Sequence, residues 1–254
     1  LDSSPTMTDE NQDNFLSEVE ENKEKSTLKN SYKVLARKYR PQNFEDLMGQ
    51  EIMVQTLRNA FKTNRIAHAY ILTGVRGIGK TTTARLLARS LNYETETINE
   101  PNIEMSELGR HCLEIMESRH IDVIEMDAAS RTGIADIREI IDSVNYSPSS
   151  ARYKIYIIDE VHMLSKAAFN GLLKTLEEPP SHVKFIFATT EVQKIPLTIL
   201  SRCQRFDLKR FDHDMIKSLL NNVCEKEMVS VEDPIIDLIA KASGGSARDS
   251  LSLL

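Results

Sequence analysis

The stretch "AHAYILTGVRGIGKTTTARLLARSL" (Ala67–Leu91) decides the fold, because a strand pattern, a glycine-rich loop and a helix pattern follow one another in it without interruption. The apolar run "AHAYILTG" predicts a short buried strand, and "KTTTARLLARSL" predicts a helix. Between them, "GVRGIGKT" (Gly74–Thr81) matches the phosphate-loop pattern G-x-x-x-x-G-K-[ST]. A strand, this loop and a helix in that order indicate an α/β protein that binds a nucleotide.

The loop has the residue types that phosphate binding needs. Its glycines permit a tight turn whose backbone N–H groups point at phosphate oxygens, and the helix N-terminus adds partial positive charge. Lys80 is expected to bridge the β- and γ-phosphates of ATP, and the Thr81 hydroxyl is expected to hold Mg²⁺. The predicted ATP-binding residues of this stretch are Gly74, Gly77, Gly79, Lys80, Thr81 and Thr82.

Apolar runs and helix patterns continue to alternate after this stretch. Each run is nearly continuous in apolar residues, as expected for strands buried on both faces of a parallel sheet. The intervening helix patterns indicate crossover connections, so we expect an α/β core with a parallel five-stranded sheet. The further strands are expected at 121–128, 153–160, 183–190 and 204–208, and the helices between them at 133–144 and 166–180.

The segments on either side of this core differ from it. Residues 1–30 are acidic and poor in apolar residues, which predicts a disordered tail. A helix is expected from Asp46 to Ala60, and from Asp212 onward the pattern becomes wholly helical. The predicted organisation is an acidic tail at 1–30, an α/β ATPase domain at 31–210 and a small, truncated three-helix lid at 211–254.

Composition limits the class of protein. Hydrophobic residues make up 41% of 254, enough for a buried core. The net charge is −6, of which residues 1–30 carry −5 (three lysines against eight acids), so the rest is near neutral and nucleic-acid binding is not excluded. Three widely spaced cysteines indicate a reducing compartment. We find no transmembrane or signal-peptide pattern, and therefore expect a cytoplasmic protein.

Two strand ends carry candidate catalytic residues. "YIIDEVH" ends a buried strand with Asp159 and Glu160, and ligands of parallel sheets lie at the carboxyl ends of strands. Asp159 is expected to face Mg²⁺, and Glu160 to orient and activate the attacking water. "FIFATTE" ends the next strand with Thr189 and Thr190, whose hydroxyls are candidates for contact with the γ-phosphate or the water. For Thr189 we favour an ordinary strand-end role.

Two arginines have no role that their local sequence alone assigns. Arg202 lies in a short polar break, "SRC", between an apolar helix-like run and a strand-like run. Arg248 opens the last helix pattern, in "GGSARDSL", where an arginine is usually solvated. Each is either ordinary surface or aimed at a phosphate.

These motifs together resemble those of AAA+ ATPases, and most closely those of the gamma/tau family of bacterial DNA polymerase III, the motors of the sliding-clamp loader. The resemblance covers the chain from about Ser31 to its end. It rests on "YKVLARKYRPQNFEDLMGQ", "AHAYILTGVRGIGKTTTARLLARSLN", "MDAASRTGIADIREI", "IIDEVHMLSKAAFNGLLKTLEEPP", "FATTEVQKIPLTILSRC" and "ASGGSARDSLSL".

The resemblance implies a role for each of these positions. Lys80 and Thr81 match the Walker A pair, and Asp159 and Glu160 match the Walker B acids. Thr190 matches sensor 1, and Arg248 matches sensor 2. The residues implied to border the adenine are Ala36, Tyr39, Arg40 and Pro41.

The Ser-Arg-Cys motif of this family implies that Arg202 is an arginine finger supplied in trans. It would complete the ATP site of a neighbouring subunit. An always-charged planar guanidinium suits this role, because hydrolysis spreads negative charge over the γ-phosphoryl oxygens. Supplying the finger from a neighbour makes hydrolysis wait for correct assembly.

The family also implies contacts with primer–template DNA through helix N-terminal regions. The matching residues are Arg131, Arg138 and Lys174. Such contacts read the phosphate backbone rather than the base sequence, so binding should weaken steeply with salt. Where members often carry a lysine, this chain has Gly133, which removes one expected contact.

The chain departs from the family in the segment that normally holds a four-cysteine zinc module. Of the four thiols, only Cys112 remains, and structural zinc needs four well-placed N or S ligands. His111 and His120 do not restore four ligands at a usual spacing. We therefore expect no zinc. The residues that stand in place of the other thiols are Tyr93, Ser106 and Gly109.

The resemblance implies an ATP-hydrolysing motor subunit that works with other loader subunits, the sliding clamp and primed DNA, with no polymerase active site of its own. The collar that assembles the loader lies outside this sequence. Two alternatives remain: another AAA+ DNA motor, such as a branch-migration motor, and a non-hydrolysing loader scaffold. The intact Lys80, Thr81, Asp159 and Glu160 argue against the scaffold.

Overall fold

The computed structural model describes residues 34–130 and 134–254. The chain divides at Lys38 into two compact units, and the described part of the first holds a short helix, α2 (Leu35–Lys38). The second unit is Tyr39–Leu254. The tail predicted at 1–30 lies outside the described residues, and the domain boundary predicted at 210/211 stays a prediction.

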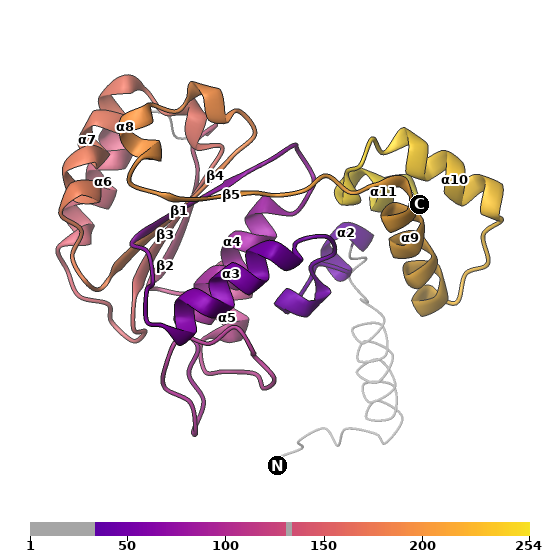
Figure 1. Ribbon diagram of the computed structural model, residues 1–254, viewed down its shortest axis with the longest axis horizontal. Coiled ribbons are helices and arrows are strands. Elements are labelled where there is room, and N and C mark those ends of the chain that lie inside the picture. The colour runs from indigo at the N-terminus through magenta and orange to yellow at the C-terminus, as the bar shows by residue number, and fades with distance from the viewer. Residues whose placement is uncertain (1–33, 131–133) are drawn as a thin grey trace, which may run out of the picture. The chain divides into compact units, whose positions relative to one another are not determined.

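The second unit is built on a five-stranded sheet in which every pairing is parallel (Figure 1). The strand order is β2-β3-β4-β1-β5, so the strand before the glycine-rich loop lies inside the sheet. This confirms the parallel five-stranded core predicted from the alternating pattern. The strands are β1 (Ala69–Thr73), β2 (Val123–Asp127), β3 (Lys154–Asp159), β4 (Val183–Thr189) and β5 (Gln204–Asp207).

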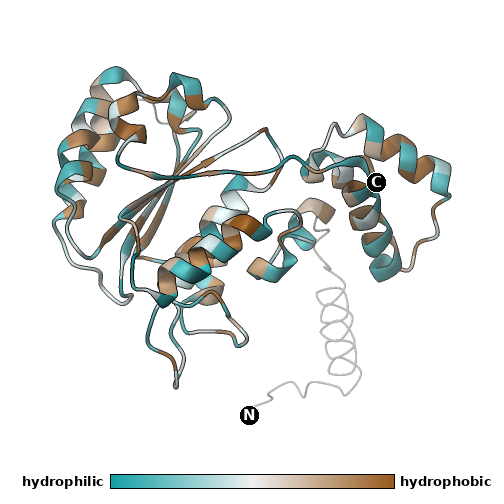
Figure 2. Cartoon of the chain, in the orientation of Figure 1, coloured by the Kyte–Doolittle hydropathy of each residue, from teal (hydrophilic) through white to brown (hydrophobic). Residues whose placement is uncertain are grey.

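Helices cover both faces of the sheet: α3, α4 and α5 lie on one side, and α6, α7 and α8 on the other (Figure 1). Successive strand residues point to opposite faces, so Leu72 joins the core under α4 while Ile71 joins the core under α7. In Figure 2 the strands are mostly hydrophobic, whereas the helices are hydrophobic in part. The helices are α3 (Glu51–Lys62), α4 (Lys80–Leu91), α5 (Cys112–Met116), α6 (Ile134–Val144), α7 (Lys166–Glu177) and α8 (Leu197–Leu200).

Three helices follow β5, as the change of pattern after Asp212 predicts: α9 (His213–Glu227), α10 (Asp233–Ala242) and α11 (Ala247–Leu253). Side-chain oxygens of Asp212 and Ser246 cap α9 and α11 by accepting backbone N–H groups of their first turns. No described helix combines the length and apolar character needed to cross a lipid bilayer.

The helix predicted from Asp46 to Ala60 was wrong at its start. Phe44–Asp46 forms a separate 3₁₀ turn, η1, closed by reciprocal contacts between Asn43 and Asp46. Gly49 then adopts a left-handed conformation (φ 72°), which ends any continuous helix, and α3 begins at Glu51. Apolar residues do recur at helical spacing here, but local polar contacts fold the start of the segment into a separate turn.

The loop before β3 is tied to the start of β2 by one buried carboxylate. Asp122 is 1% exposed and accepts backbone N–H groups of Ser149, Ser150 and Ala151 at 2.7, 2.7 and 2.9 Å. Burial opposes its charged form, but these N–H donors outweigh burial and hold the pKa of Asp122 below its ordinary value. This contact fixes the entry into β3, the strand that ends at Asp159.

We expect Asp122→Ala to lower the free energy of unfolding by roughly 1.5–3 kcal/mol, because three backbone N–H donors lose a buried charged acceptor. The lowered pKa means that this stabilisation is complete above the ordinary aspartate pKa of about 4 and is lost as the pH falls through the folded value. Urea unfolding at several pH values measures both effects. Asp142→Ala, at an exposed position of α6, is the matched control. Equal stability of the two variants would contradict the anchoring role.

Candidate nucleotide-binding site

Parallel register brings the ends of three strands to one edge of the sheet. Thr73 of β1 pairs with Thr189 of β4, and Ile158 of β3 pairs with Phe187 of β4. The glycine-rich loop follows β1 directly and leads into α4. The loop, the acids after β3 and the threonines after β4 therefore share this edge, as their positions at strand ends predicted.

The loop itself takes a conformation that a side chain would disturb. Gly77 is left-handed (φ 79°), and a Cβ atom built on it would lie 1.9 Å from the Ser246 hydroxyl oxygen. The backbone N–H of Arg248 donates to the Gly77 carbonyl oxygen at 3.3 Å. The start of α11 thus lies against the loop, which places the predicted sensor residue Arg248 beside the predicted phosphate site.

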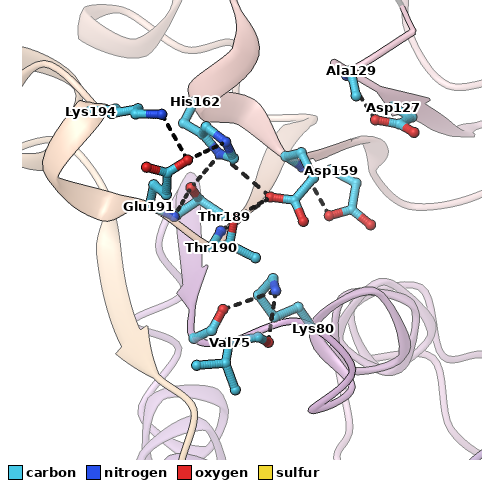
Figure 3. Close-up of polar contacts among 12 residues, drawn as sticks. Val75, Lys80, Asp127, Ala129, Asp159, His162, Thr189, Thr190, Glu191 and Lys194 are labelled. Atoms are coloured by element: carbon cyan, nitrogen blue, oxygen red, sulfur yellow. Dashed lines mark hydrogen bonds and ion pairs between the residues drawn. The ribbon is translucent and has the colours of Figure 1, made fainter. Parts of the chain in front are cut away.

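Lys80, the first residue of α4, is buried, with a relative exposure of 6%. Its ammonium donates to the carbonyl oxygens of Gly74 at 3.0 Å and Val75 at 3.1 Å (Figure 3). Burial lowers the pKa of Lys80, and the carboxylates of Glu160 and Asp159 oppose this shift. A buried cation held by loop carbonyls at a helix N-terminus is suited to receive an anion.

Thr81 and Asp159 form a pair of hard oxygen donors beside this lysine. The Thr81 hydroxyl donates to Asp159 Oδ2 at 2.5 Å, and Asp159 Oδ1 accepts the Glu160 N–H at 2.9 Å. One hydroxyl and one carboxylate, completed by phosphate oxygens and water, is the kind of donor set that Mg²⁺ takes in phosphate sites. The chemistry of these residues therefore fits the predicted ion.

Glu160 and Thr190 are brought together from two strand ends. Glu160 Oε2 accepts the Thr190 hydroxyl at 3.0 Å and the Thr190 N–H at 3.2 Å. The backbone of Glu160 is left-handed (φ 46°), which costs a non-glycine residue roughly 1–2 kcal/mol. Strained residues of this kind persist where the surroundings determine them and are common at functional sites.

Sequence reasoning missed the neighbours that surround this pair. His162, in the 3₁₀ turn η2 (Val161–Met163), lies between Glu160 and Glu191, and Lys194 donates to Glu191 (Figure 3). Thr189, for which an ordinary strand-end role was favoured, is fully buried and contacts His162. The motif "DEVH" places His162 two residues after Glu160, which was a signal for their proximity. The contact of His162 with Glu191 joins the ends of two strands, and the spacing of residues in the sequence does not predict it.

Arg202 lies just after α8, and its contacts are not with the loop. Its guanidinium donates to Glu177 Oε1 at 2.6 Å and to the Thr198 carbonyl oxygen at 2.6 Å. The side chain is 31% exposed. Arg202 is therefore partly accessible and held at the end of α7, apart from the Lys80 and Glu160 group.

Known protein families match almost the whole second unit of the chain. The sequence profile described as "DNA polymerase III, delta subunit" matches residues 49–212. The profile "DNA polymerase III clamp loader subunit, ATPase lid domain" matches residues 215–254. The tau subunit of DNA polymerase III from Escherichia coli (strain K12) is 51% identical over 223 residues, and the tau subunit from Bacillus subtilis (strain 168) is 50% identical over 224. The chain belongs to the gamma/tau family of DNA polymerase III clamp-loader subunits.

The alignments with these two gamma/tau relatives each cover 88% of this chain but only 34% and 39% of the relatives, so it spans little more than a third of their length. Among solved structures, the RuvB Holliday-junction branch migration motor of Thermotoga maritima has a TM-score of 0.58 at 21% identity, over 84% of this chain and 63% of that one. That likeness shows a shared AAA+ fold and confirms the predicted α/β core followed by a helical lid.

The residues implied to border the adenine fall in both units of this gamma/tau chain. Ala36 belongs to α2 in the first unit. In the second unit, the Tyr39 hydroxyl donates to Glu227 of α9 at 2.7 Å. Burial raises the pKa of Glu125, but its hydrogen bonds with Arg85 and, as a smaller effect, the positive charge of Arg40 hold that pKa below its ordinary value. A role for these residues and Pro41 at the adenine stays a prediction.

Two of the predicted DNA-contacting residues are described, and both are exposed. Arg138 lies on α6 and Lys174 on α7, and these two helices pack together. Their exposure leaves both side chains accessible to solvent, and their role in DNA binding stays a prediction. Arg131 lies outside the described residues, as does Gly133.

The segment in which the resemblance implied a zinc module and the sequence predicted none is folded around buried side chains. Tyr93 and Cys112 join the core of the sheet, and the Tyr93 hydroxyl donates to the Glu107 carbonyl oxygen at 3.0 Å. His111 Nδ1 and His120 Nε2 lie 2.8 Å apart, both buried, and burial lowers the pKa of His120. Across residues 34–130 and 134–254, no three His, Cys, Asp or Glu side chains are placed to hold a metal ion.

We expect the purified protein to contain no stoichiometric zinc and its thermal unfolding midpoint to be unchanged by a zinc-selective chelator. The reason is that hydrophobic packing of this segment takes over what a structural zinc contributes to folding. Elemental analysis and thermal unfolding with and without the chelator make the measurement. A fall of the midpoint in the chelator, restored by added zinc, would show that a zinc site exists.

Proposed function

We propose that this chain is the ATP-hydrolysing motor part of a clamp-loader subunit that loads a sliding clamp onto primed DNA in the bacterial cytoplasm. The observation that carries the proposal is the convergence of Lys80, Thr81, Asp159, Glu160 and Thr190 at one edge of the sheet. This set supplies a cation for phosphate, a hard oxygen pair and a carboxylate base, which phosphoryl transfer to water requires.

Thr81 and Asp159 would hold Mg²⁺, which when bound neutralises charge that develops on the phosphate oxygens. Lys80 would bind the β- and γ-phosphates through the ammonium that now contacts loop carbonyls. Glu160 would accept the proton of the attacking water. Thr190, hydrogen-bonded to that carboxylate, would orient the carboxylate toward the water, which attacks the γ-phosphate in line.

Two arginines would link hydrolysis to assembly. The backbone of Arg248 contacts the phosphate loop, and its positive charge adds to burial in lowering the pKa of Lys80. Arg248 would therefore report the γ-phosphate to the helical lid. Arg202 contacts Glu177 instead of the loop, as expected for a finger that serves a neighbouring subunit. Arg138 and Lys174, exposed on adjacent helices, would contact DNA phosphates.

The two rival functions make different demands on the site. A branch-migration motor shares the fold, as the RuvB likeness shows, but would move along DNA strands on its own. A non-hydrolysing scaffold would not need the Glu160–Thr190 pair, which costs backbone strain to form. The intact pair favours a hydrolysing subunit, and 50–51% identity to tau subunits favours a clamp loader.

We expect Arg202→Ala to reduce ATP turnover by roughly 10³–10⁵-fold, the usual worth of an arginine finger. Turnover is measured on a loader rebuilt around the full-length protein, with clamp and primed DNA. ATP binding by the isolated subunit should be unchanged, because the finger serves another subunit's nucleotide.

Arg205→Ala is the matched control, since Arg205 is a nearby exposed arginine that pairs with Asp207 of its own strand. It should leave turnover unchanged. If Arg202→Ala turns over ATP like the wild type, the trans mechanism is wrong. If the wild-type loader binds no ATP, the motor function itself is wrong and the scaffold alternative stands.

A further inference from the structure

We propose that His162 is a positioning residue for ATP hydrolysis, which holds the Glu160 carboxylate in place and links it to Glu191. This inference rests on the proposed ATPase function. It adds to that function a residue outside the phosphate loop, the acid pair and the two arginines.

His162 is buried among acidic and hydroxyl groups from two strand ends. Its side chain is 6% exposed. Nδ1 lies 3.0 Å from Thr189 Oγ1 and 3.4 Å from Glu160 Oε2, and Nε2 lies 3.3 Å from Glu191 Oε1. The ring therefore spans the space between Glu160, the proposed base after β3, and Glu191, an acid after β4 (Figure 3).

The chemistry of the neighbours fixes which ring nitrogen carries the proton. The pKa of Glu191 is lowered, first by the hydrogen bond from Lys194, so Glu191 is ionised and can only accept. Nε2 must then donate toward it, which leaves Nδ1 of the neutral ring as an acceptor for the Thr189 hydroxyl. With a proton on Nδ1 as well, the ring donates to Glu160 Oε2, and this form holds the carboxylate directly. Without that proton, the ring holds Thr189, whose neighbour Thr190 binds the Glu160 carboxylate. In both forms the ring stays tied to the two strand ends.

The same contacts hold the Glu160 carboxylate by one of its two oxygens. Within the described residues, its carboxylate contacts all reach Oε2: two come from Thr190 and one from His162. Anchoring one oxygen fixes the plane of the carboxylate and leaves Oε1 to face the attacking water. Loss of the His162 contact would let the carboxylate rotate, and a small misplacement of a base can cost about 100-fold in rate.

Three substitutions separate positioning from packing. In His162→Asn the amide reaches the place of Nδ1, next to Thr189 and Glu160. In His162→Gln it reaches the place of Nε2, next to Glu191. His162→Ala removes both. We expect the Asn variant to keep most of the wild-type kcat, and the Gln and Ala variants to lose roughly 10- to 100-fold, with the KM for ATP unchanged in all three.

The measurement is steady-state ATP turnover by the full-length protein in its assembled loader, with clamp and primed DNA. Thermal unfolding is recorded for each variant. His182→Gln is the matched control, because His182 is a partly buried histidine of the same domain. Among the residues that the structure describes, its ring has one hydrogen bond, to the Val144 carbonyl oxygen. Its turnover should equal that of the wild type.

Each outcome decides the inference. Recovery of kcat by Asn but not by Gln supports it, because packing alone would treat the two amides by size. Equal kcat in wild type, Asn, Gln and Ala overturns it while leaving the ATPase function intact. Equal loss in Asn and Gln, or a rise in KM with constant kcat, overturns it as well. If the wild type does not hydrolyse ATP, the proposed function and this inference both fall.

Discussion

Parallel pairing of β1, β3 and β4 is the constraint on which the rest of the site depends. Because all strands run the same way, their carboxyl ends fall at one edge, and the register aligns Thr73 with Thr189. The glycine-rich loop, Asp159 and Thr190 are separated widely in sequence, yet this pairing brings them together. Without this register, the same motifs would lie apart and could not form one site.

The charges at this edge are balanced around one buried cation. Lys80 is desolvated, which opposes its charge, and the acids after β3 compensate for part of that cost. Burying an unpaired ammonium would be far more expensive, so loop carbonyls and nearby carboxylates are needed together. The strained Glu160 backbone is tolerated because its side chain contributes to a polar network. That network reaches from Thr81 through Asp159 and His162 to Lys194.

The segment after α4, residues 92–120, is held to the sheet by side-chain packing and hydrogen bonds. Tyr93 and Cys112 pack into the sheet core, and Arg152 donates to the carbonyl oxygen of Leu91 at the end of α4. Arg85 of α4 and Glu125 of β2 form a bidentate ion pair, with hydrogen bonds of 2.7 and 2.8 Å. These contacts connect the segment and its neighbours by side-chain packing and charge.

The sequence by itself determined the strands, the phosphate loop and the candidate Lys80, Thr81, Asp159 and Glu160, because each depends on local periodicity or on a motif of fixed spacing. It also determined the family. Only the tertiary structure decided the strand order, the start of α3 after Gly49, and the partners of His162, Arg202 and Asp122. Those depend on contacts between segments far apart in the chain, and periodicity carries no record of which segments meet.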